Sequence, residues 1–164
     1  MPISGDLYRQ LGRASAGAVS VVAAHEPDSD AIAALTISSF VTLSYEPPLV
    51  MFAIQRNTVS YASMVTCRSF GVSLLEAGQA EVARHFAKPA RERTIFPPFA
   101  AGRVVRVPLV PEALAQIECL TNEVFMSGDH AIVVGLVEAA RTRDGEPLIY
   151  FARQYGLFVP LSGS

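Results

Sequence analysis

Short apolar runs separated by turn residues dominate the chain. Segment 113–125 alternates apolar and polar side chains, a pattern typical of a strand with one buried face. The pair Asp144-Gly145 is a common hairpin signal. Seven or more short strands of this kind favour a β-barrel. The other expected strands are 18–24, 31–38, 40–43, 49–54, 69–75, 131–139, 147–151 and 155–159.

Three segments have helical spacing instead. Residues 5–13 follow Ser4, a good N-cap, and place Leu7 and Leu11 on one face. Residues 58–66 can begin at Asn57 or Thr58 as the N-cap, and 76–86 carries apolar residues at helical intervals. No internal repeat or linker divides the chain, so we expect one domain over 1–164 in which short helices cap the barrel.

Segment 87–111 lacks a clear period and holds five prolines. A long irregular segment in a compact domain is usually functional. Its four arginines, at 91, 93, 103 and 106, are candidates for binding a 2′-phosphate.

The composition narrows the class of protein. Hydrophobic residues make up 51% of the chain and charged residues 17%, which excludes disorder and favours an additional buried face at a subunit interface. A formal net charge of −2 argues against binding to nucleic acid or to an anionic membrane. Two separated cysteines and three scattered histidines indicate neither a disulfide framework nor a metal site. Without a signal peptide or a membrane-length apolar run, we expect a cytoplasmic protein.

Motifs for several common chemistries are missing. The chain has no Gly-x-Gly-x-x-Gly, Walker A or Gly-x-Ser-x-Gly sequence, which argues against a Rossmann site, a P-loop or a serine hydrolase. Two hydroxyl-rich segments, 36–40 and 55–61, each follow an apolar strand. Hydroxyls and backbone N–H groups at such positions can hold a phosphate, but ordinary strand-end and cap chemistry is the more common explanation of such segments.

The residues also resemble a known family. Residues 34–50, ALTISSFVTLSYEPPLV, are similar to the signature of the flavin reductase-like, FMN-binding split-barrel proteins. Before this segment, residues 11–13 and 16–19 resemble the family's amino-terminal helix and first strand. After it, further family motifs are matched in the same order by 69–75, Gly128-Asp129-His130, 147–151 and 153–156.

This resemblance implies a mainly β protein. Its fold would be a six-stranded antiparallel split β-barrel of the Greek-key type with short capping helices, assembled as a homodimer. Its activity would be NAD(P)H:flavin oxidoreduction, with NADH or NADPH reducing FMN or FAD. Many such proteins are reductase components of two-component monooxygenases, whose reduced flavin diffuses to a separate oxygenase.

The resemblance also implies a set of site residues. Asn57, Thr58 and Ser60 would hold the flavin phosphate, and a cation in the segment of Arg84, Phe86 and Lys88 would neutralise it. The catalytic pair would be His130, which contacts and orients the nicotinamide, and Tyr155. Thr36, Ser38 and Ser39 would hydrogen-bond the flavin ring edge or ribityl chain, and Ile37 and Gln55 would also belong to the cofactor-binding set.

Ala34 departs from the family pattern, which usually has glycine there. One added methyl group either tilts the flavin ring or weakens its binding. The alternative function is a non-catalytic split-barrel module that binds flavin or heme. Relatives that oxidise pyridoxamine phosphate are a lesser alternative, because their basic phosphate ligands are not evident. The sequence does not decide between FMN and FAD, between NADH and NADPH, or between bound and diffusing flavin.

Overall fold

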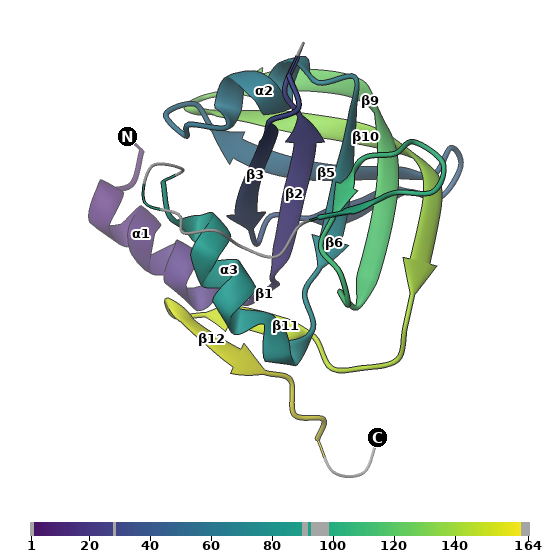
Figure 1. Cartoon of the computed structure of the whole chain (residues 1–164). Helices are drawn as coiled ribbons and strands as arrows, with labels where there is room; N and C mark the ends of the chain where they lie inside the picture. The colour runs from purple at the N-terminus through teal and green to yellow at the C-terminus, as the bar shows by residue number, and fades with distance from the viewer. Residues whose placement is uncertain (1, 28, 90–91, 93–98, 162–164) are drawn as a thin grey trace.

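A seven-stranded antiparallel sheet forms the body of the molecule. The computed structural model describes residues 2–27, 29–89, 92 and 99–161. The strand order in the sheet is β3-β2-β6-β9-β10-β5-β4, and Figure 1 shows the sheet curling around an enclosed interior. The strands are β2 (Ser20–His25), β3 (Ile32–Ile37), β4 (Val41–Ser44), β5 (Leu49–Gln55), β6 (Ser69–Leu74), β9 (Ala115–Ser127) and β10 (His130–Thr142).

The barrel is split between its two edge strands. Strands β3 and β4 are consecutive in the chain, yet they do not pair with each other. Between them, the Ser39 hydroxyl donates to the Ala53 carbonyl at 3.0 Å and accepts from the Ala53 N–H at 3.1 Å. The expected split barrel is therefore confirmed. Its sheet has one strand more than the expected six, because the four-residue β4 pairs with β5 at the edge.

Within the described residues, two smaller sheets and three α-helices surround the barrel. Strand β11 (Leu148–Phe151) pairs with both β1 (Gly17–Ala18) and β12 (Gln154–Leu157), whereas β7 (Ala100–Ala101) pairs with β8 (Pro108–Leu109). No helix in the described part of the chain is long and apolar enough to cross a membrane. The helices are α1 (Gly5–Ala14), α2 (Tyr61–Thr66) and α3 (Ala80–Ala87), with a 3-10 turn, η1 (Ala77–Gln79), before α3.

The core consists of two clusters on opposite faces of β2 and β3. In the barrel interior, Phe52 and Phe70 meet edge to face with ring centroids 5.3 Å apart. Gly135 lies against Phe70, and a Cβ there would come within 2.4 Å of that ring. The second cluster lies beneath α3 and includes Val21, Ala34, Ala83 and Phe86. Burial of this helix face seats α3 on the sheet and places its C-terminus near the end of β3.

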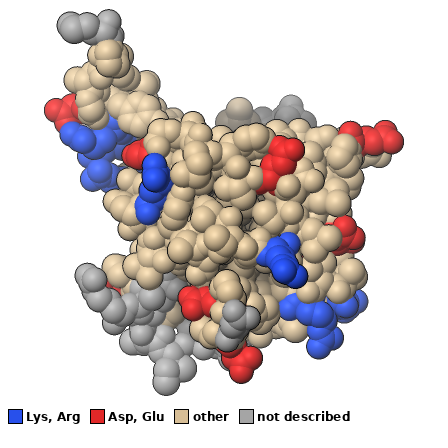
Figure 2. All heavy atoms as spheres, turned by 90° about the horizontal axis from the view of Figure 1, so that it is seen from above, with Lys and Arg blue, Asp and Glu red and all other residues tan. Residues whose placement is uncertain are grey.

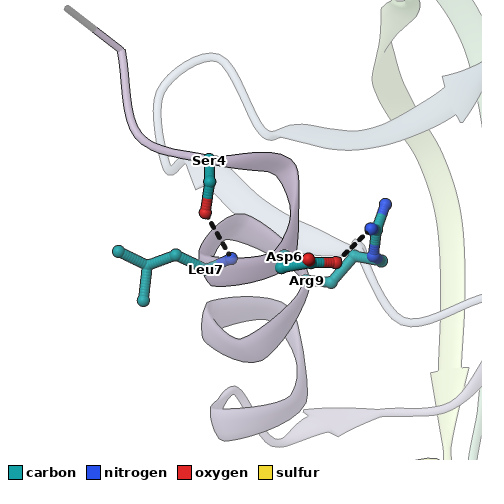
Figure 3. A network of polar contacts seen from close by, with 4 residues as sticks. All are labelled: Ser4, Asp6, Leu7 and Arg9. Atoms are coloured by element: carbon teal, nitrogen blue, oxygen red, sulfur yellow. Dashed lines mark hydrogen bonds and ion pairs between the residues drawn. The ribbon is translucent and has the colours of Figure 1, made fainter.

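Helix α1 stands at the side of the barrel (Figure 1). The Ser4 hydroxyl accepts a hydrogen bond from the Leu7 N–H at 3.2 Å, and Asp6 pairs with Arg9 on the next turn (Figure 3). The predicted cap at Ser4 is therefore confirmed. None of the helix residues is buried, and Leu7 and Leu11 keep 46% and 55% of their surface exposed. The apolar face of α1 is thus uncovered in a single chain.

Helix α2 begins later than the sequence predicts. Its N-cap is Ser60, so the predicted cap at Asn57 or Thr58 is wrong. The physical reason is a tight turn after β5, in which both the N–H and the hydroxyl of Thr58 donate to the Gln55 carbonyl. This turn projects residues 56–59 away from the sheet as a short exposed loop.

Candidate functional site

A groove runs beside α3, formed by two adjoining cavities of about 200 and 290 Å³. Thr36 and Ala87 line both cavities and so join them. The smaller cavity is also lined by Val19, Ile37, Ser38, Tyr150 and Tyr155. The larger one is also lined by Leu35, Asn57, Thr58, Val59, Ser60, Phe86, Lys88 and Pro89.

The larger cavity is the polar end of the groove. Lys88, the only lysine in the chain, follows α3, and Asn57 lies in the loop after β5. The Asn57 amide has no partner among the described residues. By contrast, the Ser60 hydroxyl donates to the Ala34 carbonyl at 3.2 Å, and the Thr58 hydroxyl donates to the Gln55 carbonyl. A cation and an amide donor at one end suit an anionic group such as a phosphate.

The smaller cavity is the aromatic end. Tyr150 and Tyr155 lie directly opposite each other on β11 and β12, with ring centroids 5.3 Å apart. The Arg84 guanidinium lies 5.5 Å from the centroid of the Tyr155 ring and also pairs with Glu81. Burial raises the pKa of Tyr155, and the nearby Tyr150 adds to this, so the phenol stays protonated at neutral pH. This end offers an aromatic wall with a hydrogen-bond donor.

The middle of the groove is held by contacts between β3 and α3. The Thr36 hydroxyl donates to the Ala83 carbonyl at 2.7 Å, and Phe86 packs against Phe99 with centroids 5.2 Å apart. Ser38 is exposed at the end of β3 and its hydroxyl bonds no described residue. The hydroxyl proton of Thr36 is thus bonded within the protein, whereas the hydroxyl proton of Ser38 can be donated to a ligand.

A second group of predicted residues does not line the groove. His130 begins β10 and pairs with Gln55, the last residue of β5. The His130 Nδ1 lies 2.7 Å from an Asp129 carboxylate oxygen. Hydrogen bonds from His130 and, secondarily, Gln55 hold the pKa of Asp129 below its ordinary value. We call this set, Gln55, Asp129 and His130, the hairpin corner.

Ala34 does not face the groove. Its side chain is buried beneath α3 with Val21 and Ala83, and its carbonyl accepts the Ser60 hydroxyl. The methyl group therefore packs in the core. The predicted tilt of a bound ring by this methyl group has no basis in the structure.

The cysteines take no part in the site. Both Cys67 and Cys119 are buried and free. Burial raises the pKa of each thiol, that of Cys119 to about 12, so both stay protonated and unreactive. Within the described residues, no three His, Cys, Asp or Glu side chains gather closely enough to hold a metal ion.

Most of the predicted site residues line the groove, namely Thr36, Ile37, Ser38, Asn57, Thr58, Ser60, Phe86, Lys88 and Tyr155. Ser39 bridges the split, Arg84 stacks on Tyr155 from outside, and Gln55 and His130 form the hairpin corner. Sequence reasoning missed Tyr150, Ala87 and Asp129 as contributors. Tyr150 was detectable in principle, because expected strands 147–151 and 155–159 each carry a tyrosine.

Comparisons with known proteins identify related sequences and structures. The protein-family model described as 'Flavin reductase like domain' matches residues 11–157 of this chain. The reductase component of 4-hydroxyphenylacetate 3-monooxygenase from Thermus thermophilus is 36% identical over 146 residues, which cover 88% of this chain and 90% of that protein. An NADH-dependent flavin reductase from a Rhodococcus species is 31% identical over 151 residues, which cover 91% of this chain and 83% of that protein.

The solved structures give the same result. The NADH:FAD oxidoreductase of Streptomyces globisporus C-1027, in complex with NAD and FAD fragments, superimposes with a TM-score of 0.87. It is 27% identical, and the match covers 99% of each chain. The assignment to NAD(P)H-dependent flavin reductases made from the sequence motifs is confirmed. Because the family model spans residues 11–157, the chain belongs to the flavin reductase-like family.

Proposed function

We propose that this chain uses NADH or NADPH to reduce FMN or FAD and releases the reduced flavin to a separate monooxygenase. The observation that carries the proposal is the groove, which joins a cationic polar end to an aromatic end. A flavin nucleotide has the matching form, with a phosphate at one end and a flat ring at the other. The relative named as a monooxygenase reductase component supports a separate oxygenase partner.

The proposed flavin lies along the groove. Its phosphate binds at Asn57, Thr58, Ser60 and Lys88, where the side chains of Asn57 and Lys88 are the donors. Its ribityl chain and ring follow residues 36–39, where Ser38 donates from the exposed strand end. Thr36 and Ser39 act by fixing the backbone, because their hydroxyl protons are already bonded within the protein.

The proposed catalytic contribution of the protein is alignment. The flavin and the nicotinamide supply the hydride chemistry between them, and the chain holds the two rings in contact. His130 and Tyr155 are the residues that we assign to the pyridine nucleotide. Arg84 steadies Tyr155 through its position over the phenol ring.

The proposed assembly is a homodimer in the cytoplasm. The uncovered apolar face of α1 supports it, as do Leu157, Phe158, Val159 and Leu161, which are 56–86% exposed near the C-terminus. Charged side chains of both signs are scattered over the face in Figure 2, with wide uncharged areas between them, which is compatible with self-association. The two free thiols suit a reducing compartment.

Lys88→Gln tests the polar end. Loss of the cation is expected to raise the Kd for FMN by about tenfold and to flatten the dependence of Kd on salt concentration, because one charge–phosphate attraction is lost. Fluorescence titration of FMN at several salt concentrations measures both effects. Arg13→Gln, at the exposed end of α1, is the matched control and should leave both unchanged. An unaltered salt dependence in Lys88→Gln would contradict the placement of the phosphate.

A further inference from the structure

Asp129 lies at the tip of the β9–β10 hairpin, where one backbone contact and one side-chain contact position it. Its carbonyl accepts the Arg56 N–H at 2.9 Å, and its carboxylate, 80% exposed, lies 2.7 Å from the His130 Nδ1. Gly128 precedes it with φ +58°, which turns the chain sharply at this point. These contacts place the carboxylate against one particular nitrogen of the imidazole.

The Asp129–His130 contact determines where the imidazole proton lies. An ionised carboxylate only accepts hydrogen bonds, so the short Nδ1–Oδ1 contact of 2.7 Å requires the proton on Nδ1. The hydrogen bond from His130 keeps the pKa of Asp129 low, so the carboxylate is ionised at neutral pH. In the neutral ring the lone pair is then on Nε2. No described residue bonds Nε2, and the His130 side chain is 42% exposed.

We propose that Asp129 is a positioning residue that holds neutral His130 in the Nδ1–H tautomer, so that Nε2 accepts a hydrogen bond from the substrate. The substrate group facing His130 must therefore be an N–H or O–H donor. This inference rests on the proposed function, in which His130 contacts the pyridine nucleotide. The nicotinamide carboxamide carries one such donor, its amino group, and we assign that group to Nε2.

This assignment predicts that the protein prefers NADH to an analogue that lacks the amino group of the carboxamide. Reduced 3-acetylpyridine adenine dinucleotide replaces the amino group by a methyl group, which cannot donate to Nε2. A site that accepts a substrate N–H disfavours an analogue lacking it, because the Nε2 acceptor, covered by the bound dinucleotide, would lose its partner. The ratio of kcat/KM for NADH to kcat/KM for this analogue reports on the contact. Comparing ratios between variants cancels the different intrinsic reactivity of the two dinucleotides.

The test compares four variants: Asp129→Ala, Asp129→Asn, His130→Ala and the double alanine variant. The kinetics are measured at a pH above the usual titration range of imidazole. We expect the ratio to fall about fivefold or more in Asp129→Ala and in His130→Ala, with no further fall in the double variant. Asp129→Asn should keep most of the ratio, because its carbonyl can still accept from Nδ1. Asp144→Ala, an exposed acid in the loop after β10, is the control and should match the unchanged protein.

Nitrogen NMR of His130 gives a readout that does not depend on turnover. The proton should be found on Nδ1 in the unchanged protein and shift toward Nε2 in Asp129→Ala. A proton on Nε2 in the unchanged protein, or an unchanged kcat/KM ratio in a folded Asp129→Ala variant, would overturn the inference. Suppose instead that the protein oxidises no dinucleotide but carries its His130 proton on Nδ1. The proposed function and the carboxamide assignment would then be wrong, whereas the orientation of His130 by Asp129 would still hold.

Discussion

Replacing Ala87 by tryptophan is expected to raise the Kd for flavin by about 100-fold, which corresponds to about 2.7 kcal/mol of binding free energy. Ala87 is the last residue of α3, is exposed, and lines both cavities of the groove. An indole there would occupy the junction through which a flavin must pass from the polar end to the aromatic end. The fold should be unaffected, because the side chain at this position points away from the core.

Flavin fluorescence titration measures this change directly. The control is Ala14→Trp, which puts the same side chain at the exposed end of α1 and away from the groove lining. Both variants should melt at the temperature of the unchanged protein. Normal flavin affinity in a folded Ala87→Trp variant would show that flavin binds elsewhere.

Glu118→Gln is expected to cost about 2 to 4 kcal/mol of unfolding free energy at neutral pH, since it removes charge-assisted hydrogen bonds from a buried carboxylate. The Glu118 side chain is 5% exposed and faces the loop between β7 and β8. Its carboxylate accepts the N–H groups of Arg103 (2.6 Å), Val104 (3.0 Å), Val105 (2.6 Å) and Arg106 (3.3 Å). A glutamine would turn an amide N–H toward donors that need an acceptor.

The same contacts make stability depend on pH. Burial alone would raise the pKa of Glu118, but the four backbone hydrogen bonds outweigh it and hold the pKa below its ordinary value. The ionised form is therefore favoured more in the folded than in the unfolded chain. This contribution is present above the unfolded pKa, about 4.3, and is lost as pH falls through the lower folded pKa.

Urea unfolding from pH 7 down into the acid range measures both effects. The unchanged protein should lose stability as the pH falls, and Glu118→Gln should be less stable at pH 7 and less sensitive to acid. Glu123→Gln, at an exposed position on the same strand, is the control. Equal stability of Glu118→Gln and the unchanged protein at pH 7 would show that the carboxylate does not anchor the loop.

Local patterns predicted most strands but not every turn between them. The hairpin at Gly128-Asp129 follows from its glycine, whereas the turn between β11 and β12 uses Ala152 and Arg153 at φ +49° and +67°, without a glycine to mark it. The hairpin predicted at Asp144-Gly145 is wrong. Strand β11 does not pair with β10 after that turn but with β1 and β12, and this choice depends on contacts distant in sequence.

The candidate site, too, was predicted from the sequence only in part. The hydroxyl-rich loop at 57–60 was visible in the sequence and lines the polar end. Spacing could not show that the hydroxyls of Thr36, Ser39 and Ser60 donate to backbone carbonyls, because those partners are distant in the sequence. His130 does not line the groove, because it begins β10 opposite Gln55, the last residue of β5. Arg103 and Arg106 hold Glu118 through their backbones, and Arg91 and Arg93 lie outside the described residues.

The central claim is that this chain reduces flavin with a pyridine nucleotide. The most direct measurement follows the absorbance of NADH and of NADPH at their reduced-nicotinamide band, under air, with the purified chain and added FMN or FAD. We expect oxidation that depends on both the chain and the added flavin, and that is greatly slowed in Ala87→Trp. The contradicting result is quenching of flavin fluorescence on mixing while neither NADH nor NADPH is oxidised with FMN or with FAD. The chain would then be a flavin-binding module without reductase activity.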